Sequence, residues 1–297
     1  MSAPRLAGVG GIFIDDIVLP DGTTYMGRLG GGVVHAMMGA ALWGERPGII
    51  ALAGQDLPAD IDDFLSQHLD TSGLHRLAIP QIRAWQIFEH DGTRRELYRV
   101  AETQPFIDGA QPRHLPADYA NTRSYYLLQG FAGLRRWRSA VQGLILWEPL
   151  QQIMTPGNLE AFRTVLPLAD IVSPNLQEVQ QLYGHHPAEQ LAAALLRDGA
   201  NRVILRMGAA GSLVARPGTS WSIPAAPVTS IIDQTGAGNT YNGAFLAGIM
   251  QGKNEYEAGI MGAVAAAFCL EYIGVLNPSR ILRETLDSRY RALLQAR

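Results

Sequence analysis

The stretch Asp233-Gln-Thr-Gly-Ala-Gly-Asn-Thr240 joins an apolar segment, residues 228–232, to a segment rich in alanine and glycine, residues 241–250. This order predicts a strand, a tight turn and a helix, because Gly236 and Gly238 permit a sharp turn and leave the backbone amides uncovered. Amides at the amino end of a helix attract an anion, and the helix dipole strengthens that attraction. The stretch therefore predicts a site for a phosphate group, or for the negative charge that develops on one during transfer.

A purely structural turn would have the same local pattern, so the rest of the chain has to decide between the two. Short apolar segments alternate along it with segments of helical spacing, which is typical of a parallel sheet covered by helices on both faces. We therefore predict an α/β fold with a central, mostly parallel sheet, built as a single domain over residues 1–297. The expected strands are 48–52, 125–128, 144–147, 171–172 and 203–205, and a final helix is expected over 278–297.

Two segments interrupt this alternation with the pattern of β-hairpins. Asp21-Gly22 and Asp91-Gly92 each lie between two runs of β-prone residues. Asp-Gly pairs are typical of tight hairpin turns. We expect residues 14–29 and 81–100 to form a small β-stranded lid over a ligand crevice, with an edge hairpin of no such role as the alternative.

The composition excludes several classes of function. A net charge of -3 and a pI near 6.2 give no electrostatic footprint for nucleic acid. Lys253 is the only lysine, and its surroundings lack the glycine and hydroxyl residues of a P-loop. Cys269 is the only cysteine and lies in an apolar run, which predicts a buried thiol and fits a cytoplasmic location. No segment has the length and hydrophobicity of a secretory signal or a membrane span, so we expect no membrane partner.

The turn and its surroundings resemble the PfkB family of ribokinase-like kinases. Residues 233–245 are similar to that family's Asp-Thr-x-Gly-Ala-Gly-Asp signature and to the helix with Gly-Ala-Phe that follows it. The resemblance implies a ribokinase-like fold and ATP-dependent phosphorylation of a small hydroxylated metabolite of the sugar or nucleoside class. Further matching segments occur in the family's order across essentially the whole chain, at 10–15, 30–36, 53–56, 70–73, 174–178 and 206–211. Trp147-Glu148-Pro149, together with Ser-Pro-Asn at 173–175, is similar to a partly fungal branch.

The resemblance also implies roles for individual residues, and ATP, Mg²⁺ and, in some members, K⁺ as cofactors. A homodimer through the lid is a further implied partner. The catalytic and anion-binding positions are Asn239, Gly236, Ala237 and Gly238. The acceptor positions are Asp15, Gly31, Gly32 and His35. The nucleotide and cation positions are Asn175, Glu178, Arg206, Gly208, Gly211, Asp233 and Thr235, with Glu178 holding Mg²⁺ through water.

Each of these roles has a structural alternative. Asp15 and Asp16 are expected to end a strand and to face opposite sides of it, so that Asp15 could equally begin a polar turn. His35 would contact the acceptor, titrate near neutrality, or serve as a buried structural histidine. Asn175 and Glu178 lie one helical turn apart and would face one site, or else form a helix cap beside a solvated carboxylate.

Asn239 is the one departure from the family's signature that bears on chemistry. The family has an aspartate here, and that aspartate takes the proton from the attacking hydroxyl. An amide cannot do so at neutral pH, although it can accept a hydrogen bond from the hydroxyl. Loss of a general base costs roughly 10²–10⁴-fold in rate, whereas positioning and electrostatics supply most of the acceleration in phosphoryl transfer.

Three hypotheses remain open from the sequence. The chain is a working but atypical kinase, a binding protein that keeps the kinase fold, or an active kinase in which Asn239 was substituted to trap a complex. A natural Asn239 would mark either lost catalysis or an acidic acceptor, because a fixed carboxylate repels an anionic acceptor by about 4 kcal/mol at ~4 Å and an effective dielectric near 20. If another base is needed, Asp15, Asp16 and His35 are the nearest candidates by motif.

Overall fold

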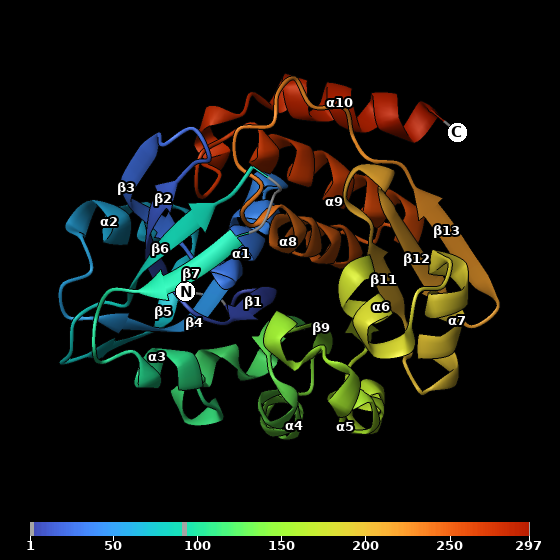
Figure 1. Cartoon of the computed structure of the whole chain (residues 1–297), viewed down its shortest axis with the longest axis horizontal. Coiled ribbons are helices and arrows are strands. Elements are labelled where there is room, and N and C mark those ends of the chain that lie inside the picture. The colour runs from blue at the N-terminus through green and yellow to red at the C-terminus, as the bar shows by residue number, and fades with distance from the viewer. Residues whose placement is uncertain (1–2, 91–93, 297) are drawn as a thin grey trace.

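The computed structural model describes residues 3–90 and 94–296, and it contains one large and one small sheet (Figure 1). The large sheet has nine strands in the order β13-β12-β11-β10-β9-β8-β1-β4-β5. All neighbours pair in parallel except at the β11–β12–β13 end, where the pairing is antiparallel. Its strands are β1 (Leu6–Val9), β4 (Gly48–Gly54), β5 (Asp70–Leu77), β8 (Ser124–Gln129), β9 (Leu144–Pro149), β10 (Ile171–Val172), β11 (Val203–Arg206), β12 (Ser212–Arg216) and β13 (Thr219–Ile223).

Both faces of this sheet are buried, as expected for parallel strands connected by helices. Successive residues of a strand point to opposite faces, so each strand contributes to two separate cores. In β8, Tyr126 belongs to one core while Tyr125 and Leu127 belong to the other. The predicted strands at 48–52, 125–128, 144–147, 171–172 and 203–205 are all present, and the α/β fold class is confirmed.

Helices cover the two faces in two groups. One core contains residues of α1, α2, α8, α9 and α10, and the other contains residues of α4, α5, α6 and α7. Figure 1 shows α1, α8 and α9 together on one side and α4 and α5 on the other, with α10 outermost beyond α9. The helices are α1 (Gly32–Leu42), α2 (Ala59–His68), α3 (Gln104–Asp108), α4 (Phe131–Ala140), α5 (Leu159–Val165), α6 (Leu176–Tyr183), α7 (Ala188–Arg197), α8 (Ala237–Met250), α9 (Glu255–Leu270) and α10 (Arg283–Gln295).

Helices α1 and α8 approach each other more closely than ordinary side chains would allow. A Cβ atom placed on Gly39 would lie 2.2 Å from the carbonyl oxygen of Thr240, and one placed on Gly243 would lie 1.6 Å from that of Ala36. Backbone therefore packs on backbone at this crossing. The contact aligns the amino ends of the two helices, at Gly31–Gly32 and at Gly236–Ala237, on one side of the sheet.

The small sheet confirms the predicted lid. Its order is β3-β2-β6-β7, from β2 (Phe13–Val18), β3 (Thr24–Gly30), β6 (Arg83–Phe88) and β7 (Arg94–Tyr98). Strands β2 and β3 form a hairpin around Gly22, whose φ of 83° is the conformation that glycine adopts readily. Strands β6 and β7 are antiparallel, but the predicted turn at Asp91-Gly92 lies outside the described residues.

The segment before the glycine-rich turn and the start of the final helix differ from the prediction. Residues 228–232 form no strand, because Pro224 and Pro227 precede them and their amides bond elsewhere: Thr229 donates to Glu271 and Ile232 to the Leu270 carbonyl. The last strand before the glycine-rich turn is β13. The final helix starts at Arg283 instead of Pro278, since 278–280 form a separate 3₁₀ turn capped by Asn277.

Among the helices of the described residues, none is both long and apolar enough to cross a membrane.

The α1–α8 crossing predicts a sharp difference between two glycine-to-alanine changes. Gly243→Ala should lower the free energy of unfolding by at least about 2 kcal/mol, because overpacking against a backbone carbonyl outweighs the helix propensity gained. Gly157→Ala should change it by less than about 0.5 kcal/mol, because a Cβ atom there meets nothing within 4 Å. Urea unfolding measures both, and equal effects would contradict the close crossing.

Candidate active site

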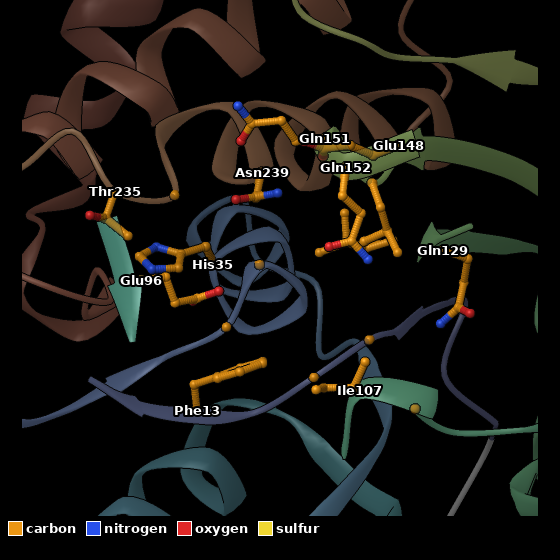
Figure 2. A pocket seen from close by; sticks show the side chains of 18 of the residues that line it. Phe13, His35, Glu96, Ile107, Gln129, Glu148, Gln151, Gln152, Thr235 and Asn239 are labelled. Carbon is orange, nitrogen blue, oxygen red and sulfur yellow. The ribbon is translucent and has the colours of Figure 1, made fainter. Parts of the chain in front are cut away.

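A cavity of about 660 Å³ opens where the carboxyl ends of β1, β8 and β9 face the small sheet. Ligands of open α/β sheets bind outside the carboxyl ends of the strands, so its position is the expected one. Figure 2 shows Asn239 between Thr235 and His35 on one side and Glu148 and Gln152 on the other, with Phe13 and Ile107 across the cavity. The predicted residues Asp15, Gly31, Gly32, His35, Glu178, Thr235, Gly236 and Asn239 all line it.

Two helices begin at this cavity. Gly31 caps the amino end of α1 and Gly236 caps that of α8, and both line the cavity wall. Gly236 has φ 75°, and a Cβ atom on it would lie 2.1 Å from the His35 ring, so both its conformation and its space require glycine. Helix α8 starts at Ala237, four residues earlier than predicted, which places Asn239 in its first turn. The free amides of both helices favour an anion here.

The side chain of Asn239 is held in place by a hydrogen bond from its amide nitrogen. Its Nδ2 donates to Tyr126 Oη at 3.0 Å, and Tyr126 Oη donates to Glu148 Oε2 at 2.7 Å. Figure 2 shows the amide oxygen of Asn239 turned away from Glu148. Gly32 makes room for the side chain, since a Cβ atom there would lie 2.9 Å from Asn239 Nδ2. The remaining acceptor of the side chain, Oδ1, is therefore the atom available to a ligand.

Arg206 lies directly behind the glycine-rich turn. Its Nη2 donates to Glu148 Oε1 at 2.8 Å and to the Ser173 carbonyl at 2.9 Å. A Cβ atom on Gly238 would lie 1.9 Å from Arg206 Nη1, so the guanidinium packs against the bare backbone of the turn. Arg206 Nε is buried without a partner. Arg206 thus lies behind the glycine-rich turn, and its predicted nucleotide role stays a prediction.

Asn175 and Glu178 form a reciprocal capping box at the start of α6. Asn175 Oδ1 accepts from the Glu178 amide and Glu178 Oε2 accepts from the Asn175 amide, each at 2.8 Å. Asn175 therefore has the capping role of the structural alternative. Glu178 is not the solvated carboxylate of that alternative, because it is buried and lines the cavity. Burial raises the pKa of Glu178, and the positive charge of Arg206 opposes that rise.

Asp15 and Asp16 face opposite sides, as predicted, but they lie within β2 of the small sheet and do not end the first strand. The first strand ends at Val9, because Gly10 and Gly11 interrupt it. Asp15 is buried, lines the cavity and accepts from Gln86 Nε2 at 3.2 Å. Asp16 points away and pairs with Arg99 and the Gly27 amide, so it is not a base for this site.

His35 is buried beneath Gly236 and stays neutral at physiological pH. Burial lowers its pKa to about 4, against the opposing effect of Asp233. The buried position therefore argues against the alternative that His35 titrates near neutrality. Asp233 is itself buried and accepts from the amides of Thr235 and Gly274, at 2.8 and 2.9 Å. Cys269 lies 3.8 Å from His35 Nδ1, and burial raises its thiol pKa to about 12, which leaves it unreactive.

Among the predicted nucleotide and cation residues, those that do not line the cavity are Asn175, Arg206, Gly208, Gly211 and Asp233. Gly208 and Gly211 form the 3₁₀ turn after β11 and do not line it. A Cβ atom on Gly208 would meet nothing within 4 Å, so this turn is open, whereas Gly211 packs against the Ile223 carbonyl. Their nucleotide role stays a prediction, as does K⁺ beside Asp233. Within residues 3–90 and 94–296, no group of three or more His, Cys, Asp or Glu is arranged to hold a metal ion.

The cavity is acidic. Asp15, Glu96, Glu148 and Glu178 line it, and no lysine or arginine occurs among its described lining residues. An anionic acceptor would therefore meet several carboxylates and no facing basic side chain. This charge pattern argues against the acidic acceptor considered from the sequence.

Several site residues were not anticipated. Gln86 bridges Asp15 and Glu96, donating to Glu96 Oε1 at 2.7 Å, and so connects two strands of the lid. Tyr126 and Glu148 come from β8 and β9, and only the register of those strands brings them together. A carboxylate that follows the apolar strand residues 144–147 and precedes Pro149 was the available signal for Glu148.

The comparisons with known proteins agree with this geometry. Residues 148–282 match the model of the pfkB family of carbohydrate kinases. A cytidine kinase of Thermococcus kodakarensis is 27% identical over 258 residues, covering 84% of this chain and 89% of that protein. An uncharacterised protein of Schizosaccharomyces pombe is 24% identical over 313 residues, 90% of this chain and 84% of its own length.

Among solved structures, an Escherichia coli protein assigned as ribokinase II, in complex with ATP and Mg²⁺, has a TM-score of 0.79. It is 20% identical, and the match covers 98% of this chain and 100% of that one. This likeness shows the ribokinase-like fold.

The buried position of His35 predicts that it does not titrate between pH 5 and 8. Its pKa of about 4 lies below the ordinary value near 6.5, so the unfolded chain binds the proton more tightly. The free energy of unfolding therefore rises with pH between about pH 4 and 6.5. Histidine NMR signals followed against pH test this, with the chain in urea as control. A His35 midpoint near 6.5 in the folded protein would contradict the buried environment.

Proposed function

We propose that this chain belongs to the PfkB/ribokinase family and transfers the terminal phosphate of ATP to a hydroxyl group of a sugar or nucleoside held in the cavity. The observation that carries the proposal is the turn at Gly236–Asn239, which forms the amino end of α8 and lines the cavity with Gly236 and Asn239. Such a site stabilises the charge that develops on a phosphoryl group in transfer. The start of α1 adds a second helix end to the same wall.

The residues present fit a bound Mg²⁺–ATP. Mg²⁺ prefers oxygen ligands and keeps several waters, and the buried Glu178 carboxylate faces the cavity beside Arg206. Glu178 would hold the ion through water, and the ion would neutralise charge on the phosphates. The open turn at Gly208 would admit the nucleotide. In support, the Escherichia coli protein of the same fold was solved with ATP and Mg²⁺.

The acceptor is proposed to be neutral and rich in hydroxyl groups. Asp15 and Glu96, joined by Gln86, offer hydrogen-bond acceptors from the lid, while Phe13 and Ile107 offer an apolar surface. Carboxylates and amides of this kind bind hydroxyl donors. The similarity to a cytidine kinase adds support for the nucleoside class.

Asn239 would orient the attacking hydroxyl without removing its proton. Its Oδ1 accepts a hydrogen bond from that hydroxyl, the oxygen forms a bond to the γ-phosphorus as the bond to ADP breaks, and the proton leaves to a phosphate oxygen or water. Because positioning supplies most of the acceleration, turnover is retained but slowed, by roughly 10²–10⁴-fold relative to a site with a base.

A binding protein that keeps the kinase fold is the second candidate. The observation that favours it is again Asn239, which lacks a titratable proton acceptor. Turnover of ATP in the presence of acceptor separates the two candidates.

The test is ADP formation from Mg²⁺–ATP over a panel of sugars and nucleosides, with calorimetry of ATP binding alongside. We expect acceptor-dependent turnover. Asp15→Asn should then raise KM for the acceptor about tenfold or more, because it removes a charged hydrogen-bond partner, and leave KM for ATP unchanged. Asp16→Asn is the matched control, since Asp16 faces away from the cavity.

Three outcomes are distinguishable. Turnover supports the kinase. Binding of ATP and of an acceptor without turnover supports the binding protein. Failure to bind ATP with the fold intact would contradict both.

A further inference from the structure

We propose that Tyr126 and Glu148 are positioning residues that require an amide at position 239 and aim its oxygen at the acceptor. For the reaction, this inference rests on the proposed function. For the stability of the protein, it means that the hydrogen-bonding surroundings of position 239 accept an amide and disfavour a carboxylate. It implies that replacing Asn239 by aspartate alone does not restore an ordinary active site.

The Tyr126 hydroxyl has a single proton to donate. Tyr126 Oη has two polar neighbours, Glu148 Oε2 at 2.7 Å and the Asn239 side chain at 3.0 Å. Because a carboxylate can only accept, Tyr126 uses its hydroxyl proton to donate a hydrogen bond to Glu148. Tyr126 Oη then presents lone pairs to position 239, and the residue there has to donate. The nitrogen of an amide meets that requirement, and its oxygen is turned to the cavity as a result.

Hydrogen bonds from other buried groups hold Glu148 in place as the acceptor for Tyr126. Its Oε1 accepts from Arg206 Nη2, and its Oε2 also accepts from Asn242 Nδ2 at 2.6 Å. Asn242 in turn accepts at its Oδ1 from the Ser173 hydroxyl at 2.6 Å, which fixes the orientation of its amide. All of these groups are buried or nearly so. The network therefore fixes the direction of every hydrogen bond as far as Asn239.

Ionisation of Tyr126 offers no alternative arrangement. Burial, and then the neighbouring Glu148 carboxylate, raise the pKa of Tyr126 well above its ordinary value of 10. The side chain is fully buried, so the hydroxyl stays protonated at any working pH. The direction of the hydrogen bond to position 239 thus does not change with pH.

An ionised aspartate at position 239 cannot satisfy this network. If the Tyr126 proton stays with Glu148, a carboxylate oxygen at position 239 faces a lone pair at about the 3.0 Å of the present bond. If Tyr126 instead donates its hydrogen bond to position 239, the Glu148 carboxylate faces a lone pair of Tyr126 Oη at 2.7 Å. Either arrangement sets two acceptors against each other, and only a protonated aspartate, which can donate, removes the conflict.

The test is a double-mutant cycle on thermal stability that needs no enzyme activity. The variants are Asn239→Asp, Tyr126→Phe and the two combined, each melted at pH 5 and pH 8. The matched control is Tyr125→Phe, which removes a buried hydroxyl on the adjacent residue, bonded to the Tyr119 carbonyl on the other side of the sheet. If Tyr126→Phe does not fold, the pH dependence of Asn239→Asp alone decides, because only a protonated aspartate can donate to Tyr126; an equal loss of Tm at pH 5 and pH 8 would then overturn the proposal.

We expect Asn239→Asp to lower Tm by about 4 °C or more at pH 8 and by less at pH 5. The sign follows from a raised pKa of the aspartate in the folded state, whose penalty is absent when both states are protonated and grows as pH rises through that pKa. When Asn239→Asp is combined with Tyr126→Phe, the additional loss should be less than half as large. An undiminished loss in the Tyr126→Phe background, as is expected in the Tyr125→Phe background, would overturn the proposal.

If the protein catalyses phosphorylation of an acceptor, its kinetics give a second test. Tyr126→Phe should lower kcat about tenfold or more and leave KM for ATP unchanged, because the Asn239 amide is then free to rotate. Asn239→Asp should raise turnover of a neutral acceptor more in the Tyr126→Phe background than with Tyr126 in place. A full rise with Tyr126 in place would overturn the proposal. Absence of ATP binding would instead contradict the proposed function, while the stability cycle would still decide the inference.

Discussion

The contact between α1 and α8 determines where the whole site lies. Gly39 and Gly243 allow the two helix backbones to touch, so their amino ends reach the carboxyl edge of the sheet together. One of these ends brings Gly31, Gly32 and His35, and the other brings Gly236 and Asn239. A larger side chain at the crossing would separate the two halves of the cavity wall. The smallest residues of the core therefore set the position of the chemistry.

The electrostatics of the site follow from that arrangement. The described side chains that line the cavity are acidic or neutral, and the positive potential comes from the backbone amides at two helix ends. Arg206 adds a cation behind the turn, but Glu148 and the Ser173 carbonyl hold it in place. The electrostatics that favour an anion are thereby confined to the turn itself, while the lid side of the cavity presents the hydrogen-bond acceptors Asp15 and Glu96.

The sequence was informative wherever structure depends on neighbouring residues. The glycine-rich turn was predicted in the right place, although α8 begins inside it at Ala237, and the hairpin at Asp21-Gly22 was predicted correctly, because glycine and Asp-Gly pairs act locally. The segment 228–232 looked like a strand by composition, but its strand-like residues find no partner strand and bond to α9 instead. Tyr126 and Glu148 could not be paired from the sequence, since their contact depends on the register of β8 against β9. The meaning of Asn239 could be seen only with those two residues in place.

The central position of β1 has a consequence for synthesis of the chain on the ribosome. Strand β1 precedes all the other strands, yet it lies between β4 and β8, so it acquires its second neighbour only when β8 (Ser124–Gln129) has been made. The apolar face of α1 stays uncovered for longer, because α8, which packs against it, begins only at Ala237. A nascent chain that stops before α8 would therefore carry most of the sheet with that face uncovered. Such an intermediate is a natural client for chaperones that bind exposed apolar surface.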